Sequence, residues 1–270
     1  MNNRKYVLSK VIIYSFVISI LLPLAIVALW SFVGRWSWPH LLPETISLRG
    51  MEELFGGYSS ALKTLGSSVL LSITVAVFAV IIGTMTARAL VFYDFPGKSI
   101  IQFGTILPII IPSIVFAMGT HVLFIKMGLA DSVPGVIIVH LICALPYSIK
   151  IMTDITAAFG QRLEEQAAVL GAAPSQIMTA VTLPALTPGL VSSACMAYII
   201  SYSQYFLTLL IGGGNVKTFS LIMVPYLQNG DRTIASAYSM IYVISTLLVF
   251  VIFELAVKRF SNDESGYFFA

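Results

Sequence analysis

Long apolar stretches separated by short polar segments run along most of this chain. A membrane-spanning helix needs about 20 predominantly apolar residues to cross roughly 30 Å of hydrocarbon. Six stretches reach or approach that length, and they cover residues 11–33, 65–87, 100–125, 135–149, 188–211 and 234–257. The pattern therefore predicts an all-α membrane protein with six transmembrane helices, the fourth of them short.

Basic residues predict how these helices are oriented. Cytoplasmic loops of membrane proteins carry an excess of Lys and Arg, and with six spans nine of the 15 basic residues fall on the side of the termini. We therefore expect both termini in the cytoplasm. Trp30, Trp36 and Trp38 lie at the predicted outer interface, where aromatic belts occur.

The same pattern divides the chain into three parts. Residues 1–60 hold the first span and an external segment, in which a short surface helix is predicted at 52–60. Residues 61–258 form the core membrane domain, and residues 259–270 form a polar cytoplasmic tail. The first span is long and lacks an A-x-A-like cleavage site, so we expect it to be retained.

Composition narrows the possible functions. The chain is 58% hydrophobic and 10% charged, whereas soluble domains carry about 25% charged residues. A net charge of +3 is too small and too scattered for a nucleic-acid footprint, so lipid is the expected environment. Cys143 and Cys195 fall inside apolar spans without a C-x-x-C spacing, which favours two buried thiols over a disulfide or a metal site.

Enzymatic motifs and cofactor signatures are missing from the sequence. It contains no H-E-x-x-H zinc motif, so no metal, cofactor or catalytic residue is expected. The tripeptide Gly-Lys-Ser at 97–99 ends like a phosphate-binding P-loop, but Phe92 stands where that motif needs its first glycine. If the protein uses ATP, the nucleotide must bind to another polypeptide.

A polar segment between the fourth and fifth spans differs from the rest of the chain. Its charged start, at residues 164–166, would be costly in hydrocarbon. Residues 164–170 are predicted to form one short helix, with Gly171 turning the chain at positive φ. Pro174 suits the first turn of a second helix, which we expect Leu183 and Pro184 to end. A helix–glycine–helix of this kind is suited to docking against a partner.

The residues of this segment resemble the EAA loop of ABC importer permeases. That loop has a Glu-Ala-Ala start, a glycine six residues after the Glu, and an aliphatic-x-Leu-Pro close. The matching positions here are Glu165, Ala167, Gly171, Val181, Leu183 and Pro184. Gln166 departs from the pattern, since the family usually has alanine there. On this resemblance the coupling loop spans 162–184, and its coupling residues are Glu165, Ala167, Ala168, Gly171, Ala172, Pro174, Leu183 and Pro184.

The resemblance covers residues 60–258 and implies a type I ABC importer permease in the bacterial cytoplasmic membrane. Such a permease is not an enzyme. It works with a dimer of ATP-binding subunits, a second permease subunit (a different chain or a copy of itself) and an external solute-binding protein, and it moves solute by alternating access. The chain looks most similar to the subfamily that serves polyamines, aminoethylphosphonate and iron. A secondary transporter or channel is the alternative, although such proteins usually carry more intramembrane charge.

Candidate solute contacts lie in the fifth span. Tyr198, Tyr202 and Tyr205 recur at i, i+4 and i+7, so they share one face of an uninterrupted helix, and Gln204 lies beside them. Phenolic hydroxyls need partners in hydrocarbon, so this face lines a solute path or packs against another helix; both interpretations stay open.

Intramembrane ionisable groups say little about the solute. Residues 188–211 contain no Asp or Glu, whereas polyamine permeases tend to have acidic residues there. Either the partner permease supplies the negative charge or the solute is not a polycation. His121 and His140 lie inside spans, where packing is a commoner role than proton relay.

Overall fold

A computed structural model describes residues 2–37, 39, 40, 42–56 and 61–261. The chain forms two compact units. The first comprises Met1–Lys63 and Ile222–Ser245, and the second comprises Thr64–Leu221 and Thr246–Ala270. The division at residues 60 and 258 that the sequence suggests stays a prediction.

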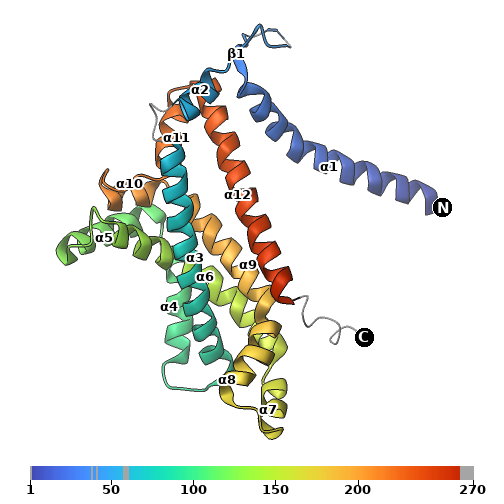
Figure 1. The fold of residues 1–270 in the computed structure, drawn as a ribbon, viewed down its shortest axis with the longest axis vertical. Helices are drawn as coiled ribbons and strands as arrows, with labels where there is room; N and C mark the ends of the chain where they lie inside the picture. The colour runs from blue at the N-terminus through green and yellow to red at the C-terminus, as the bar shows by residue number, and fades with distance from the viewer. Residues whose placement is uncertain (1, 38, 41, 57–60, 262–270) are drawn as a thin grey trace. The chain divides into compact units, whose positions relative to one another are not determined.

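The described residues are mostly helical (Figure 1). In chain order the elements are α1 (Asn2–Trp30), β1 (Val33–Arg35), β2 (Thr45–Ile46), α2 (Arg49–Phe55), α3 (Ala61–Phe92), α4 (Lys98–Ile110), α5 (Ser113–Met127), α6 (Val133–Phe159), α7 (Arg162–Val169), α8 (Pro174–Ile177), the π-helical η1 (Met178–Thr182), α9 (Leu183–Tyr202), α10 (Phe206–Gly212), α11 (Phe219–Gln228) and α12 (Arg232–Ser261).

Five helical stretches among these residues are long and apolar enough to cross a membrane. They are Ser9–Trp30, Ala61–Phe92, Val133–Phe159, Pro174–Tyr202 and Arg232–Leu255. The predicted third span is not one helix, because α4 and α5 meet at a bend of 108°. The described chain therefore has six spans when this bent pair is counted as one.

The bend follows from the proline at its centre. Ile111 precedes Pro112 and has an extended backbone, with ψ at 129°, as expected because the proline ring disfavours a helical conformation in the preceding residue. Pro112 then stands at the N-cap of α5, where its missing N–H costs nothing. We predicted one span over residues 100–125, and the structure divides it into two helices at this proline.

The fourth span is longer than predicted. Ser132 caps α6 by accepting a hydrogen bond from the amide of Gly135, and the helix runs on to Phe159. Lys150 lies inside this helix and forms an ion pair with Asp154, one turn later. Because these two charges fall on one exposed face, they do not end the helix as the hydropathy of 135–149 suggests.

Two other predictions of local structure need correction. The surface helix expected at 52–60 begins earlier, at Arg49, and ends at Phe55; residues 57–60 lie outside the described residues. Residues 212–233, which the predicted spans 188–211 and 234–257 leave as a polar connection, contain the ten-residue helix α11.

Helices α6 and α9 form the centre of the second unit and cross close to α3. The hydroxyl of Ser148 on α6 donates to the carbonyl of Ala79 on α3 at 2.7 Å, and it lies 2.6 Å from the hydroxyl of Ser193 on α9. A Cβ on Gly83 would lie 2.2 Å from the Ser148 oxygen. Small residues at a helix crossing allow this close backbone approach, which drives helix association in a membrane.

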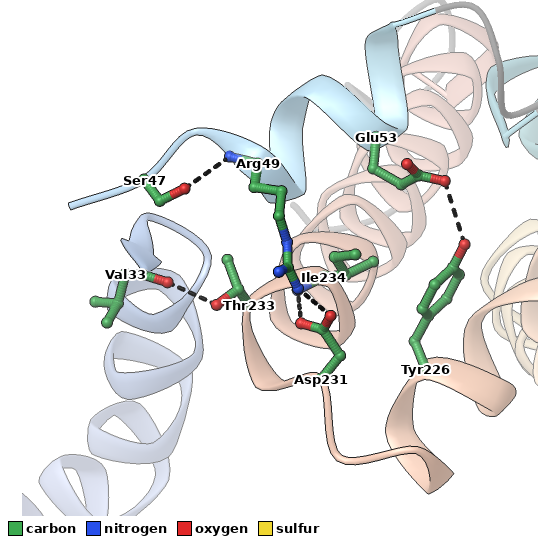
Figure 2. Close-up of polar contacts among 8 residues, drawn as sticks. All are labelled: Val33, Ser47, Arg49, Glu53, Tyr226, Asp231, Thr233 and Ile234. Atoms are coloured by element: carbon green, nitrogen blue, oxygen red, sulfur yellow. Dashed lines mark hydrogen bonds and ion pairs between the residues drawn. The ribbon is translucent and has the colours of Figure 1, made fainter. Parts of the chain in front are cut away.

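In the first unit, polar contacts fasten the segment after α1 to the residues around the start of α12 (Figure 2). Arg49 of α2 forms an ion pair with Asp231, whose carboxylate also accepts from the amide of Ile234 in the first turn of α12. The hydroxyl of Thr233 donates to the carbonyl of Val33 at 2.6 Å. Between α1 and α2, strands β1 and β2 pair antiparallel and form a short hairpin that the sequence pattern did not predict.

The α3–α6–α9 crossing gives a test of this packing. Gly83→Ala should displace the Ser148 hydroxyl and break its buried hydrogen bonds, which costs about 1–3 kcal/mol. We expect a lower thermal unfolding midpoint in detergent. Gly104→Ala is the matched control, since a Cβ there meets nothing within 4 Å. Equal midpoints for the two variants would contradict the crossing.

Candidate functional site

The polar segment between α6 and α9 folds as two helical pieces around Gly171. Helix α7 ends in the turn that follows Val169, and Gly171 has a φ of +87°. The amide of Gly171 bonds to the carbonyl of Ala168, and the amide of Ala172 bonds to that of Ala167. These two bonds form a Schellman motif, which satisfies carbonyls that a helix end leaves without partners. Four residues singled out from the sequence thus belong to one turn.

The second piece starts as predicted and ends differently. Pro174 opens α8, and the amide of Ala173 donates to the side chain of Gln176 at 2.9 Å. The helix then runs through η1 directly into α9, so Leu183 and Pro184 do not end it. The amide of Leu183 bonds to the carbonyl of Met178, five residues earlier. This π turn changes the hydrogen-bond register just before Pro184, where an α-helix would place a carbonyl against the proline ring.

One carboxylate joins the two pieces to the end of α3. The two terminal guanidinium nitrogens of Arg88, Nη1 and Nη2, donate to Glu164 at 2.7 and 2.9 Å. The hydroxyl of Thr182 in η1 donates to the same carboxylate at 2.7 Å. The pair is largely shielded from solvent, with 25% and 17% of the two side chains exposed. Bidentate charged hydrogen bonds are among the strongest in proteins, so this carboxylate fixes the position of the segment.

This arrangement also sets the ionisation of Glu164. The hydrogen bond from Arg88 lowers the pKa of the Glu164 carboxyl below its ordinary value; Thr182 adds to this effect and burial opposes it. A depressed folded-state pKa means that the pair stabilises the fold above the ordinary carboxyl range and loses that contribution as the pH falls through the lowered pKa. Near neutral pH the contact is fully charged.

A cavity of ≈ 390 Å³ opens beside this carboxylate, between α7 and α8. Its lining includes Glu164 and Glu165, with Ala168, Pro174 and Ile177 among the other residues. Glu165 is exposed, unlike Glu164.

The tip of the segment is apolar and faces solvent. Val169 and Leu170 are 88% and 87% exposed, although both are aliphatic. Exposed aliphatic side chains beside the exposed carboxylate of Glu165 favour a surface that a partner covers.

The fifth span has a second polar region, where α9 gives way to α10. Helix α9 ends at Tyr202 and α10 begins at Phe206, so Tyr205 does not continue the predicted tyrosine face. Tyr198 and Tyr202 stack at 5.3 Å between ring centroids and are 0% and 2% exposed. Tyr198 also packs edge-on against Phe250 and Phe253 of α12. Burial therefore favours helix packing for these two tyrosines, whereas Gln204 and Tyr205 stay partly exposed.

Residues 79–263 match the family described as "Binding-protein-dependent transport system inner membrane component". The match covers more than half of the chain, including the segment built around Gly171. The chain belongs to this family. It is thus a multi-pass membrane permease subunit of an ABC importer and not an enzyme, and a separate subunit hydrolyses the ATP. The alternative of a secondary transporter or channel is set aside by this membership.

Relatives of the permease are named for different solutes. It is 30% identical to the trehalose transport system permease protein SugB of Mycobacterium tuberculosis, over 63% of this chain and 61% of that protein. It is 28% identical to the molybdate/tungstate permease WtpB of Thermococcus kodakarensis, over 73% and 79% of the two chains. The spermidine/putrescine permease PotC of Haemophilus influenzae is 26% identical, over 73% and 78%.

The permease also shares its fold with a solved ABC importer. A chain of a bacterial ABC transporter involved in the import of the acidic polysaccharide alginate superposes with a TM-score of 0.72, over 93% of this chain and 96% of that one. Sequence identity is 17%, so the likeness concerns the fold.

Sequence reasoning missed the residues that hold the coupling segment in place. Glu164 stands next to the motif residue Glu165, and its carboxylate accepts hydrogen bonds from Arg88 and Thr182. Adjacent glutamates in the first turn of a helix are common and do not by themselves indicate an internal partner. Arg88, a single charge at the end of an apolar span, was the visible signal, but its pairing with Glu164 across 76 residues was not readable.

The Arg88–Glu164 pair should control the order of the segment. Arg88→Ala leaves a partly buried carboxylate with Thr182 alone, which costs about 1–3 kcal/mol. We expect faster amide hydrogen exchange in residues 162–182, and partial recovery in the charge-swapped Arg88→Glu/Glu164→Arg variant. Lys150→Ala is the control, because its pair with Asp154 is exposed and contributes little. Equal exchange in Arg88→Ala and Lys150→Ala would show that the pair does not order the segment.

Proposed function

We propose that segment 162–184 is the element through which this permease receives the work of ATP hydrolysis. The observation that carries the proposal is the fixed and exposed character of the segment. Glu164 ties it to α3 and η1, while Glu165, Val169 and Leu170 remain open to a partner. Family membership implies an ATP-binding subunit as that partner and a solute-binding protein on the other side of the membrane. The segment therefore docks on the ATP-binding subunit dimer from the cytoplasmic side.

The rest of the assembly follows from the same proposal. Both termini lie in the cytoplasm, supported by the excess of Lys and Arg on that side. The membrane is the bacterial cytoplasmic membrane. A second permease subunit, either a copy of this chain or a different one, completes the path, and transport proceeds by alternating access.

We propose further that the solute passes the break between α9 and α10. Gln204 and Tyr205 are partly exposed there, and Ser203 and Thr208 close to them in the chain carry hydroxyl groups without charge. Such a surface suits a small solute that forms hydrogen bonds. A polyamine, as transported by the PotC relatives, would need its negative counter-charge from the second permease subunit, since residues 188–211 contain no Asp or Glu.

Gly171 gives the sharpest test of coupling. A Cβ at this position meets no atom of the permease within 4 Å, but φ is +87°, so within this chain Gly171→Val acts through the backbone conformation. The strain is roughly 1–2 kcal/mol or more. We expect normal membrane abundance and loss of the ATP hydrolysis that the binding protein stimulates, with the same loss in Glu165→Lys.

The control for this experiment is Gly66→Val. Gly66 lies in α3, where an added Cβ meets nothing within 4 Å and φ is not positive. Stimulated hydrolysis at the control rate in both Gly171→Val and Glu165→Lys would refute the coupling role of the segment.

The proposed path predicts a pattern of chemical accessibility. In a background without Cys143 and Cys195, cysteines at positions 204 and 205 should react with a small hydrophilic methanethiosulfonate reagent in the assembled importer. Cysteines at positions 198 and 202 should stay protected, since those side chains are buried. Protection of all four positions would show that the α9–α10 break does not line the aqueous path, and it would refute the proposed path.

A further inference from the structure

A histidine buried in the second unit connects the two sides of the α9–α10 break. His140 of α6 is 0% exposed, and both of its ring nitrogens have partners. Nδ1 lies 3.0 Å from the hydroxyl of Ser201, in the last turn of α9. Nε2 lies 3.0 Å from the hydroxyl of Thr208, in the first turn of α10. One rigid ring thus spans the point at which the fifth span loses its helical hydrogen bonds.

The hydroxyl partners determine which nitrogen carries the proton. Thr208 donates its hydroxyl proton to the carbonyl of Gln204 at 2.9 Å. Its oxygen is therefore free to accept, and Nε2–H of His140 is the donor. Nδ1 is then the bare nitrogen and accepts from the hydroxyl of Ser201. With both nitrogens used in this way, the neutral ring serves as a bridge between two helices rather than as a proton relay.

The same network reaches the residue that we assign to the solute path. The Gln204 carbonyl accepts from Thr208 and also from the hydroxyl of Ser220 at 2.9 Å. A carbonyl held by two donors fixes the peptide plane that follows Gln204, and hence the direction of the chain at the break. His140 fixes Thr208, and Thr208 in turn fixes Gln204. Each member restricts the next because a hydroxyl has one proton to donate.

We propose that His140 is a positioning residue for transport, acting with Ser201 and Thr208 as a clamp that holds the α9–α10 break and presents Gln204 to the solute. The functional part of this proposal rests on the proposed solute path at Gln204; the clamp itself rests on the contacts of His140. His140 acts through Thr208 and does not itself need to touch solute. The absence of a charged group from these contacts is consistent with a role in geometry.

Hydrogen exchange in the importer reconstituted in nanodiscs tests the clamp without knowledge of the solute. In His140→Ala and in the isosteric Thr208→Val, the amide exchange rate of residues 203–209 should rise about fivefold to tenfold. Local opening of this segment then requires less free energy, because it no longer has to break these hydrogen bonds. Exchange in residues 162–182 should not change. Thr208→Ser keeps the hydroxyl and should restore slow exchange.

The double variant His140→Ala/Thr208→Val gives the decisive comparison. Members of one network are not additive, so its exchange in residues 203–209 should match that of either single variant. His121→Ala, at the other intramembrane histidine in α5, is the control and should leave this peptide unchanged. Slow exchange in both single variants, or a rise of the same size in His121→Ala, would overturn the clamp.

The accessibility of Gln204→Cys separates this proposal from the proposed path. If the methanethiosulfonate reagent modifies position 204, and Thr208→Val changes the rate of that modification at least about fivefold, the clamp positions Gln204 in the path. An unchanged rate would overturn the positioning role. No modification at 204 in any background, together with faster exchange in Thr208→Val, would refute the proposed path and with it the functional part of this proposal, while leaving the clamp as a finding about the fold.

Discussion

The contact between Arg88 and Glu164 is the interaction on which the proposed coupling depends. One carboxylate receives two hydrogen bonds from the end of α3 and one from η1, immediately before α9. A partner that pushes or pulls α7 must therefore carry α3 and α9 along or break charged hydrogen bonds that are shielded from solvent. Bidentate charged hydrogen bonds restrict both distance and orientation, so this contact can transmit motion from α7 to the spans. The segment is thus a rigid extension of two spans.

Polar groups inside the second unit follow the same rule. Ser148 is bonded to α3 and α9, and His140 is bonded on both sides of the α9–α10 break. Hydrocarbon offers no water to satisfy these groups, so each needs a fixed partner and each partner specifies how two helices meet. The permease therefore has two sets of polar contacts, one at the coupling segment and one at the proposed path. The continuous helix from Pro174 to Tyr202 connects them.

The sequence was informative wherever one residue type dictates one local structure. Hydropathy predicted the spans. Gly171 and Pro174 predicted the turn and the second helix of the coupling segment, because glycine allows a positive φ and proline lacks an N–H. The sequence did not show which prolines would interrupt a helix. Pro112 breaks its helix, whereas Pro184 follows a π turn and the helix continues. The difference depends on hydrogen-bond register, which the local sequence does not encode.

Long-range polar contacts were equally hidden from the sequence. Arg88 with Glu164, and His140 with Thr208, are each separated by more than 60 residues, and their pairing depends on how helices cross. The tyrosine face was predicted from an uninterrupted helix, so the break after Tyr202 removed Tyr205 from it.

Photo-crosslinking from position 170 tests the central claim most directly. Benzoylphenylalanine in place of Leu170, which is 87% exposed at the tip of the segment, is introduced into the importer in intact membranes. The account predicts a covalent product with the ATP-binding subunit, and none from the same probe at Ile46, which is 81% exposed in the first unit. A functional importer whose probe at position 170 reacts with the solute-binding protein, or with no subunit, would contradict the account.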